Sequence, residues 1–230
     1  MLSELLDRLA PELASISVCL HVDGREVFHH TTGMARLDPP LPAVDDQPYD
    51  LASVTKVLSG TAVIASLCEE GLLTLDTPVA DVLGALPTHP DATRPIQVRD
   101  LLQHGSGLPA WHPYYRDVTG PFGTQATREA VFAAVRATAP VAAPGVGHIY
   151  SDVGFLQLLQ IAETVTGKRI DVLFQERVAQ PAGVADLRYG WPFAAATEWP
   201  CPHRRVGVQG TVHDLNCASI GGASTHAGLF

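Results

Sequence analysis

The chain has little charge, and positive charge is the scarcer kind. Charged residues make up 17% of its 230 residues, Lys and Arg number 15 against 24 Asp and Glu, and the formal net charge is −9. Nucleic-acid-binding proteins neutralise phosphates with clustered Lys and Arg. The basic pairs of note here, Lys168-Arg169 and Arg204-Arg205, are too small to form such a surface. The composition therefore indicates no nucleic-acid partner.

Long hydrophobic runs and metal-binding motifs are also missing. No segment is apolar over the roughly 20 residues that a membrane-spanning helix needs, and residues 1–11 carry acidic side chains where a signal peptide would carry basic ones. The ten histidines are scattered, and no metal-ligand spacing joins the four cysteines, Cys19, Cys68, Cys201 and Cys217. Reduced thiols are typical of the cytoplasm. We therefore expect a protein without a membrane segment, a metal site or a cofactor. We expect it to be cytoplasmic, or periplasmic or secreted if the native N-terminus is missing.

The sequence does contain enough apolar material for an ordered core. Hydrophobic residues make up 46% of the chain, and its length suffices for one sizeable domain or two subdomains. Two alternating stretches, residues 16–22 and 25–29, flank Asp23-Gly24, a dipeptide typical of a tight β-hairpin. Residues 53 to about 180 carry helical patterns with caps. The sequence thus predicts an antiparallel hairpin followed by a mainly helical region.

One of the two lysines of the chain, Lys56, lies in an otherwise uncharged stretch that runs from Leu51 to Cys68. Ser53 stands three residues before it. On a helix this spacing puts the two side chains on one face, within hydrogen-bond reach. A serine hydroxyl becomes a nucleophile when a neighbouring base accepts its proton, and a lysine can be that base. The alternative is that Ser53 caps the helix while the Lys56 ammonium extends to the surface.

A second group of polar residues begins another helical pattern. A loop rich in Pro and Gly delivers Tyr150, Ser151 and Asp152 to the start of a helix that Gly167 is expected to end. The chain thus carries Ser-x-x-Lys and, about 100 residues later, Tyr-Ser-Asp at a helix start.

These motifs resemble those of the serine β-lactamase and penicillin-binding-protein superfamily, in particular the branch of class C β-lactamases, D-alanyl-D-alanine peptidases and related esterases. Further segments are similar to the same branch and follow in the expected order. They are residues 71–79, residues 96–109 with a Ser-Gly-Leu loop, residues 212–214 and residues 221–230. The resemblance therefore covers most of the chain.

The resemblance implies a role for each residue of the two motifs. Ser53 would be the acylated nucleophile and Lys56 its base, while Tyr150 would pass a proton to the leaving group and activate the deacylating water. Asp152 takes the place of the family's asparagine. Its carboxylate would hold the Lys56 ammonium, but it cannot donate a hydrogen bond to a substrate carbonyl. An Asp at the start of a helix is also a normal N-cap, which is the alternative for Asp152.

Further assignments also come from the resemblance. If residues 151–153 are aligned with the Ser-Asp-Asn of other members, Ser151 replaces Tyr150 as the proton shuttle. We favour Tyr150 because of the Pro-Gly loop before it and the helix after it. Leu108 and Trp111, in and after the Ser-Gly-Leu loop, are expected to bind substrate, and ordinary loop packing is the alternative for Trp111.

The family's third motif, Lys-Thr-Gly or His-Thr-Gly on a strand, has no clear counterpart. His226-Ala227-Gly228 fits the pattern superficially, but its surroundings resemble an earlier segment of the family. A backbone N–H of that strand completes the oxyanion hole, and losing one such donor costs about a hundredfold to a thousandfold in turnover. We therefore expect a fragment or a natural truncation that lacks the last strands.

The resemblance implies an α/β (α+β) fold of the β-lactamase/transpeptidase type, in which helices flank an antiparallel sheet and a mainly helical subdomain is added. We expect a single domain, incomplete at its C-terminus. It would comprise an N-terminal helix and sheet strands in residues 1–50, the helical region in 51–185 and a return segment toward the sheet in 186–230.

The function predicted on this basis is a serine hydrolase that forms an acyl-enzyme, in the first place an esterase on small carboxylic esters. A β-lactamase or a D-alanyl-D-alanine carboxypeptidase is the alternative with the same chemistry. A non-catalytic penicillin-binding sensor or an inactive pseudoenzyme is the alternative of another class. The expected partner is accordingly a small-molecule ester, β-lactam or peptide substrate.

Overall fold

The computed structural model describes residues 2–191, 194–195 and 209–230. The chain divides into two compact units. The first consists of residues 1–50, 190–213 and 230, and the second of residues 51–189 and 214–229. The expected return segment, 186–230, is therefore divided between the two units.

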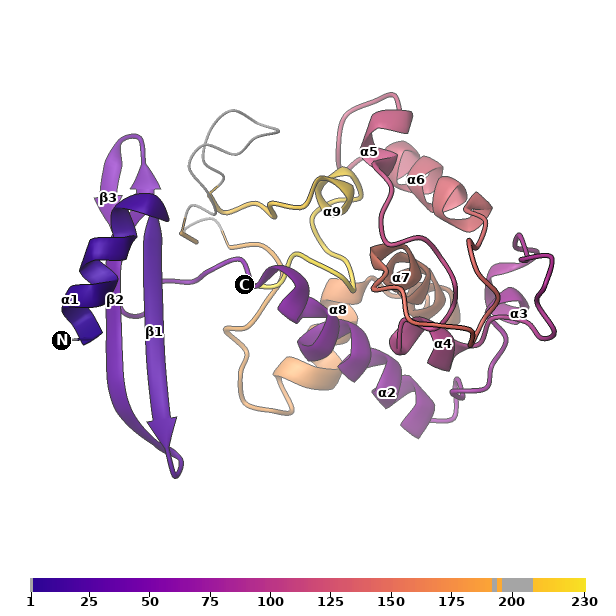
Figure 1. Ribbon diagram of the computed structural model, residues 1–230, viewed down its shortest axis with the longest axis horizontal. Coiled ribbons are helices and arrows are strands. Elements are labelled where there is room, and N and C mark those ends of the chain that lie inside the picture. The colour runs from indigo at the N-terminus through magenta and orange to yellow at the C-terminus, as the bar shows by residue number, and fades with distance from the viewer. Residues whose placement is uncertain (1, 192–193, 196–208) are drawn as a thin grey trace. The chain divides into compact units, whose positions relative to one another are not determined.

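The first unit is built on a hairpin (Figure 1). Its elements are α1 (Leu2–Leu9), the 3-10 helix η1 (Ala10–Glu12), β1 (Ser15–Val22), β2 (Arg25–Leu37) and β3 (Pro40–Pro42). The strands form an antiparallel sheet in the order β1-β2-β3. Asp23 and Gly24 both have positive φ, 51° and 74°, as a two-residue turn of type I′ requires. The predicted hairpin is confirmed, and β2 extends beyond the expected end of its strand.

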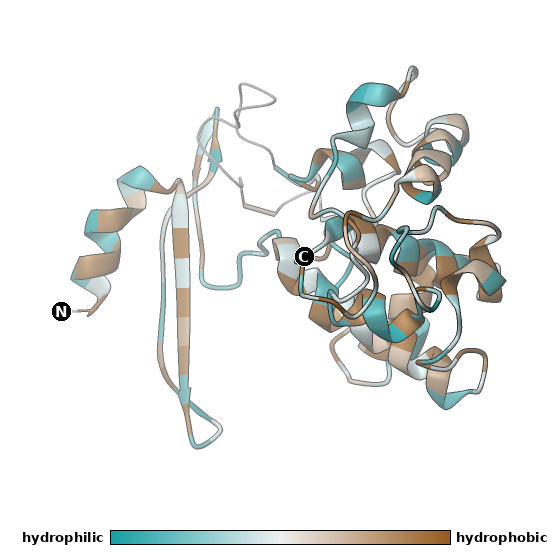
Figure 2. Ribbon diagram, turned by 45° about the vertical axis from the view of Figure 1, so that its right-hand side comes forward, coloured by the Kyte–Doolittle hydropathy of each residue, from teal (hydrophilic) through white to brown (hydrophobic). Residues whose placement is uncertain are grey.

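Residues of opposite character alternate along this hairpin, as Figure 2 shows. Because successive side chains of a strand point to opposite faces, the odd-numbered residues Ser15, Ser17, Cys19 and His21 of β1 share one face, and the apolar even-numbered residues share the other. On the second face His30 of β2 lies 3.0 Å from Asp7 of α1. The register shifts by a bulge between Leu20 and His21.

The second unit is helical. Its α-helices are α2 (Ala62–Glu69), α3 (Val79–Leu83), α4 (Val98–Leu102), α5 (Tyr114–Asp117), α6 (Gln125–Ala137), α7 (Asp152–Thr166), α8 (Ile170–Phe174) and α9 (Leu215–Ser219). The 3-10 helix η2 (Ala52–Val54) and the π-helix η3 (Lys56–Thr61) precede α2. The π-helix η4 (Gln175–Ala179) extends α8. These elements agree with the predicted mainly helical region.

Helix α7 forms the centre of the second unit (Figure 1). It packs against α2, α3, α4, α6, α8 and η3, and all residues from Val153 to Ala162 are buried. A helix that is apolar all round must be surrounded by other elements to bury its surface. As predicted, Gly167 ends it, in the left-handed conformation with φ 67°. The first turn of α7, which begins at Asp152, is therefore fixed by the packing of the buried residues that follow it.

Within the described part of the chain, no helix combines the length and the apolar character that spanning a membrane would require.

Candidate active site

The segment that carries Ser53 and Lys56 is not one regular α-helix. Ala52 has φ 46°, an unusual value for a residue with a side chain; the chain then follows the 3-10 helix η2, the π-helix η3 and finally α2. A 3-10 helix has three residues per turn, so side chains at i and i+3 eclipse. Strained φ values and π-turns concentrate at functional sites.

This local geometry joins the two side chains of the first motif. Lys56 Nζ lies 2.9 Å from Ser53 Oγ and forms a hydrogen bond with it. Ser53 is exposed, whereas Lys56 is only 3% exposed. The alternative, in which the ammonium extends into solvent, is therefore wrong. The arrangement offers an accessible hydroxyl beside a buried amine.

Asp152 completes this arrangement from the first residue of α7. Its Oδ1 lies 2.6 Å from Lys56 Nζ, and the Lys56 and Asp152 side chains are 4% and 21% exposed. The N-cap interpretation of Asp152 is wrong, because Ser151 is the N-cap and accepts the Gly154 N–H at 3.0 Å. The Asp152 carboxylate is thereby left to pair with Lys56, which then has the Ser53 hydroxyl and this carboxylate as polar neighbours.

Tyr150 stands beside the amine with its ring. Lys56 Nζ lies 4.7 Å from the centroid of the Tyr150 ring, and the side chain is 56% exposed. Among the residues that the structure describes, none forms a hydrogen bond with the Tyr150 hydroxyl. A rotation of this exposed side chain would be needed to bring the hydroxyl to a substrate, and a role in proton transfer stays a prediction.

Ser151, the alternative shuttle, is placed differently. It is 1% exposed, and its hydroxyl donates to Pro109 O at 2.7 Å while it accepts the Gly154 N–H. A hydroxyl with both functions engaged inside the core cannot exchange protons with a substrate at Ser53. The geometry therefore favours Tyr150 over Ser151.

His104 is a site residue that the sequence analysis did not single out. Its Nδ1 accepts the Ser151 N–H at 3.0 Å, and its ring packs 4.5 Å from the Tyr150 ring and 5.3 Å from the Phe155 ring. Burial and then the positive charge of Lys56 lower the pKa of His104. A neutral imidazole can accept the Ser151 N–H, so His104 holds the loop that presents Tyr150.

The sequence offered one weak signal for His104, namely its place directly before the Gly-Ser-Gly-Leu loop.

The Gly-Ser-Gly-Leu loop is fixed by a close approach of two backbone segments. Gly107 has φ 77°, and a Cβ at this position would lie 2.0 Å from Ala142 O. Two backbone hydrogen bonds, from Ile149 N to His104 O and from Asp152 N to Ala110 O, then attach it to the start of α7.

The two residues expected to bind substrate lie in different environments. Leu108 is 1% exposed and belongs to the hydrophobic core, so its side chain is not available to a substrate. Trp111 is 48% exposed. Of this pair, we retain Trp111 as a candidate for contact with an acyl group.

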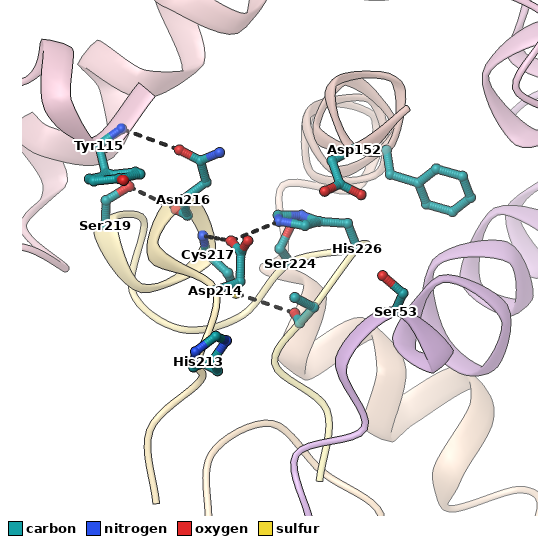
Figure 3. A network of polar contacts seen from close by, with 12 residues as sticks. Ser53, Tyr115, Asp152, His213, Asp214, Asn216, Cys217, Ser219, Ser224 and His226 are labelled. Atoms are coloured by element: carbon teal, nitrogen blue, oxygen red, sulfur yellow. Dashed lines mark hydrogen bonds and ion pairs between the residues drawn. The ribbon is translucent and has the colours of Figure 1, made fainter. Parts of the chain in front are cut away.

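A network of polar side chains joins the residue before α9 to the segment after it (Figure 3). His226 is 1% exposed; its Nδ1 lies 2.6 Å from Ser224 Oγ, and its Nε2 lies 3.1 Å from Asp214 Oδ1. Asp214 also caps α9 by accepting the Cys217 N–H at 2.7 Å. With both ring nitrogens engaged inside the protein, His226 does not present a third-motif side chain to the site.

The neighbours of Asp214 determine the pKa of its carboxyl group. Burial alone would raise the pKa of Asp214, but the neighbouring His226, the Cys217 N–H and the charge of Lys56 outweigh it and lower the pKa to about 2. Asp214 is therefore an anion at neutral pH. Although Ser224, His226 and Asp214 are joined in a row, they offer no accessible nucleophile, because Ser224 is fully buried and a substrate cannot reach its hydroxyl.

The same segment supports the residues around Ser53 through its backbone. Leu229 accepts the Leu51 N–H at 2.9 Å and donates its own N–H to Thr55 Oγ1 at 3.3 Å. Thr225 approaches the η3 turn so closely that a Cβ at Gly60 would lie 2.6 Å from Thr225 O. The end of the second unit thus holds the nucleophile segment on both sides of Ser53.

Among the described residues, no group of three His, Cys, Asp or Glu side chains at metal-binding separation includes a residue of this site. An accessible hydroxyl, a buried amine and a carboxylate that can stabilise the protonated amine suit nucleophilic catalysis.

The chain is similar to known proteins over most of its length. The family model described as Beta-lactamase matches residues 5–226. A curated relative from Escherichia coli (strain K12), provisionally named a D-alanyl-D-alanine carboxypeptidase, is 29% identical over 248 aligned residues, which cover 94% of this chain and 56% of the relative. The chain thus spans about half the length of the curated relatives that it matches.

Two solved structures illustrate the shared fold. The octameric penicillin-binding protein homologue from Pyrococcus abyssi has a TM-score of 0.75 and 24% identity, with 99% of this chain and 52% of that chain covered. The D-amino acid amidase from Ochrobactrum anthropi SV3, complexed with L-phenylalanine, has a TM-score of 0.64 and 27% identity, with coverages of 82% and 50%. The expected β-lactamase/transpeptidase-like fold is confirmed.

Proposed function

This chain belongs to the β-lactamase family, and from that premise we propose that it is a serine hydrolase that forms an acyl-enzyme at Ser53 and acts on small carboxylic esters. One observation carries the proposal: the accessible Ser53 hydroxyl is hydrogen-bonded to the buried Lys56 amine at 2.9 Å, which Asp152 contacts at 2.6 Å. Because the chain spans about half of its curated relatives' length, the activity of a longer protein is part of the proposal.

Acylation would begin at the Ser53–Lys56 hydrogen bond. The Lys56 ammonium, which is paired with Asp152 in the resting structure, must first lose a proton to solvent. The neutral amine then accepts the Ser53 proton as Ser53 Oγ forms a bond to the carbonyl carbon of the ester. The Asp152 carboxylate stabilises the ammonium that results. When the tetrahedral intermediate collapses, the bond to the leaving alkoxide breaks, and the alkoxide takes a proton through Tyr150. Water then attacks the acyl carbon and gives one proton to the side chains beside Ser53. The bond between the acyl carbon and Ser53 Oγ breaks, the carboxylic acid leaves, and Ser53 Oγ takes up that proton.

The choice of an ester rests on Asp152. At this place the family's asparagine can donate a hydrogen bond, whereas a carboxylate only accepts. A substrate that must be oriented through its amide carbonyl is therefore less well served here than an ester, whose alkoxide also leaves more easily than an amine. The exposed Trp111 ring offers an apolar surface for a short acyl chain.

A D-alanyl-D-alanine carboxypeptidase is the second candidate. It is favoured by the provisional name of the curated relative at 29% identity. The catalytic steps would be the same, with a peptide bond in place of the ester. A β-lactamase would differ only in the ring that Ser53 opens.

The test is intact mass spectrometry of the chain after exposure to p-nitrophenyl acetate, to a peptide ending in D-Ala-D-Ala and to a penicillin, each in a separate reaction. Released nitrophenol and D-alanine are recorded in parallel. Ser53→Ala should abolish adduct and turnover. Ser17→Ala, which removes another hydroxyl, on β1, is the matched control and should leave both intact.

The outcomes separate the candidates. Turnover of the ester at a higher kcat/KM than the peptide supports the esterase, and the reverse supports the carboxypeptidase. A stoichiometric penicillin adduct at Ser53 without turnover would indicate a sensor instead of an enzyme. Absence of any Ser53-dependent adduct would refute the proposal. If Tyr150 is the shuttle, Tyr150→Phe should lower kcat by about a hundredfold or more.

A further inference from the structure

Three potential metal ligands meet on the hairpin of the first unit, whereas Ser53 belongs to the second unit. They are Cys19 and His21 on β1 and Glu26 on β2, and their ligand atoms all lie within 4.8 Å of one another. All three side chains are exposed. The group combines one sulfur, one nitrogen and one oxygen donor.

The sheet geometry explains why these side chains meet. Cys19 and His21 are two residues apart on a strand, so they point to the same face. The bulge between Leu20 and His21 makes Glu26 the cross-strand partner of His21. Cys19 Sγ then reaches Glu26 Oε2 diagonally at 3.5 Å. Bulges commonly re-aim a side chain next to a functional position.

We propose that Cys19, His21 and Glu26 form a binding site for Zn²⁺. Thiolate, imidazole and carboxylate are the three ligand types that zinc takes in proteins, at about 2.0–2.3 Å from the ion. Tetrahedral geometry with such bonds separates ligand atoms by about 3.3–3.7 Å. The three ligand atoms lie within 4.8 Å of one another, so they must draw closer together when the ion binds, while the β-ladder holds both strands in register.

The fourth position of the ion remains open to water or to one further side chain of the same face. His29 is the cross-strand partner of Cys19, but its ring nitrogens do not belong to the group of ligand atoms within 4.8 Å of one another. His30, the next residue, belongs to the opposite face, where it binds Asp7. His21 on one face and His30 on the other therefore provide an internal comparison.

Binding requires the Cys19 thiolate. A free cysteine thiol is mostly protonated at neutral pH, because the ordinary pKa of a thiol is about 8.5. Zinc displaces this proton, which passes to solvent as the S–Zn bond forms. Binding should therefore release a proton and weaken as the pH falls.

Titration of the reduced, chelator-treated chain with Co²⁺ tests the proposal, because tetrahedral cobalt absorbs in the visible and a cobalt–thiolate bond adds a charge-transfer band in the near ultraviolet. Both signals should saturate at one equivalent and disappear when Zn²⁺ is added. Cys19→Ser should remove the charge-transfer band, and His21→Gln should weaken Co²⁺ binding by about tenfold or more.

Two matched variants act as controls. Cys68→Ser removes a cysteine of the second unit, on α2, and His30→Gln removes the histidine of the opposite face; neither should alter the cobalt spectrum. The proposal is overturned if the charge-transfer band survives in Cys19→Ser, or if His30→Gln weakens binding as much as His21→Gln. A spectrum of six-coordinate cobalt alone would also overturn it, since it would indicate no thiolate bond.

Discussion

Helix α7, which contributes Asp152 to the candidate active site, and the β1–β2 hairpin, which carries the proposed metal site, hold their side chains by different means. In α7, ten consecutive residues are buried, and the residues at its start are tied to neighbouring loops. In the hairpin no residue of β1 is buried and Ala35 is the single buried residue of β2. Packing therefore places the groups around Ser53, whereas strand register places Cys19, His21 and Glu26.

The difference implies different responses to substitution. A buried group that loses its partner keeps its desolvation cost, so the loss propagates to its neighbours. An exposed group that loses its partner is solvated by water. Changes near α7 should therefore be large and changes on the hairpin small, unless the change touches the ligands of the proposed metal site.

The largest expected effect is that of Lys56→Met on catalysis. The substitution preserves much of the side-chain volume but removes the base that accepts the Ser53 proton, so kcat for p-nitrophenyl acetate should fall by about 100- to 10,000-fold. Lys168→Met is the matched control, because the other lysine pairs with Glu176 in an exposed ion pair. Equal kcat values for the two variants would contradict the assigned role of Lys56.

The next effect compares stability in the two regions directly. Leu159, on α7, is fully buried, whereas Val27, on β2, is 59% exposed. Leu159→Ala should lower the free energy of unfolding by about 2–5 kcal/mol through lost burial and a cavity, and Val27→Ala by less than about 1 kcal/mol. Urea unfolding followed by far-ultraviolet circular dichroism measures both. Similar losses would show that the hairpin is packed in solution.

A smaller effect should appear in acid. The pKa of Asp214 is lowered from 3.8 to about 2 in the folded chain. A lowered pKa means that the carboxylate contributes stability above pH 3.8 and that this contribution is lost as the pH falls toward 2. At about 1.36 kcal/mol for each pKa unit, the contribution is about 2 kcal/mol.

Asp214→Asn isolates this contribution, because an asparagine still caps a helix but does not titrate. Its stability should therefore fall less steeply than that of the wild-type chain between about pH 5 and pH 2, measured by urea unfolding at each pH. Asp23→Asn, in the hairpin turn, is the control and should keep the wild-type slope. An unchanged slope in Asp214→Asn would show that the pairing with His226 does not persist in solution.

Local interactions explain what could be predicted from the sequence. The Asp23-Gly24 turn and the end of α7 at Gly167 depend on backbone conformations that a few neighbouring residues determine. The closeness of Ser53 and Lys56 depends on a spacing of three that both 3-10 and α turns satisfy. The β-lactamase-like fold followed from motifs in a characteristic order, which the family match bears out.

The remaining features depend on contacts between distant segments. The imidazole of His104 lies near Lys56 because a loop joins the start of α7 47 residues later in the chain. Glu26 meets Cys19 and His21 because of a bulge that the residue types at these positions do not predict. Asp152 was open to two interpretations because Ser and Asp are both good N-caps, and tertiary contacts to Pro109 assigned that position to Ser151.

The smallest expected effect concerns that cap. Ser151→Ala should lower the free energy of unfolding by about 1 kcal/mol, because the Gly154 N–H loses its acceptor, while kcat stays near the wild-type value. Ser17→Ala is the hairpin counterpart: it removes a cross-strand hydrogen bond of 2.8 Å to Thr31 and should cost a few tenths of a kcal/mol.

Urea unfolding and ester hydrolysis, measured on both variants, distinguish a structural serine from a catalytic one. If Ser151→Ala folds normally but loses turnover, the buried hydroxyl takes part in catalysis and the assignment of Tyr150 must be given up. If it loses stability and keeps turnover, Ser151 serves to fix the start of α7. Asp152 then meets Lys56 because the residue before it occupies the cap.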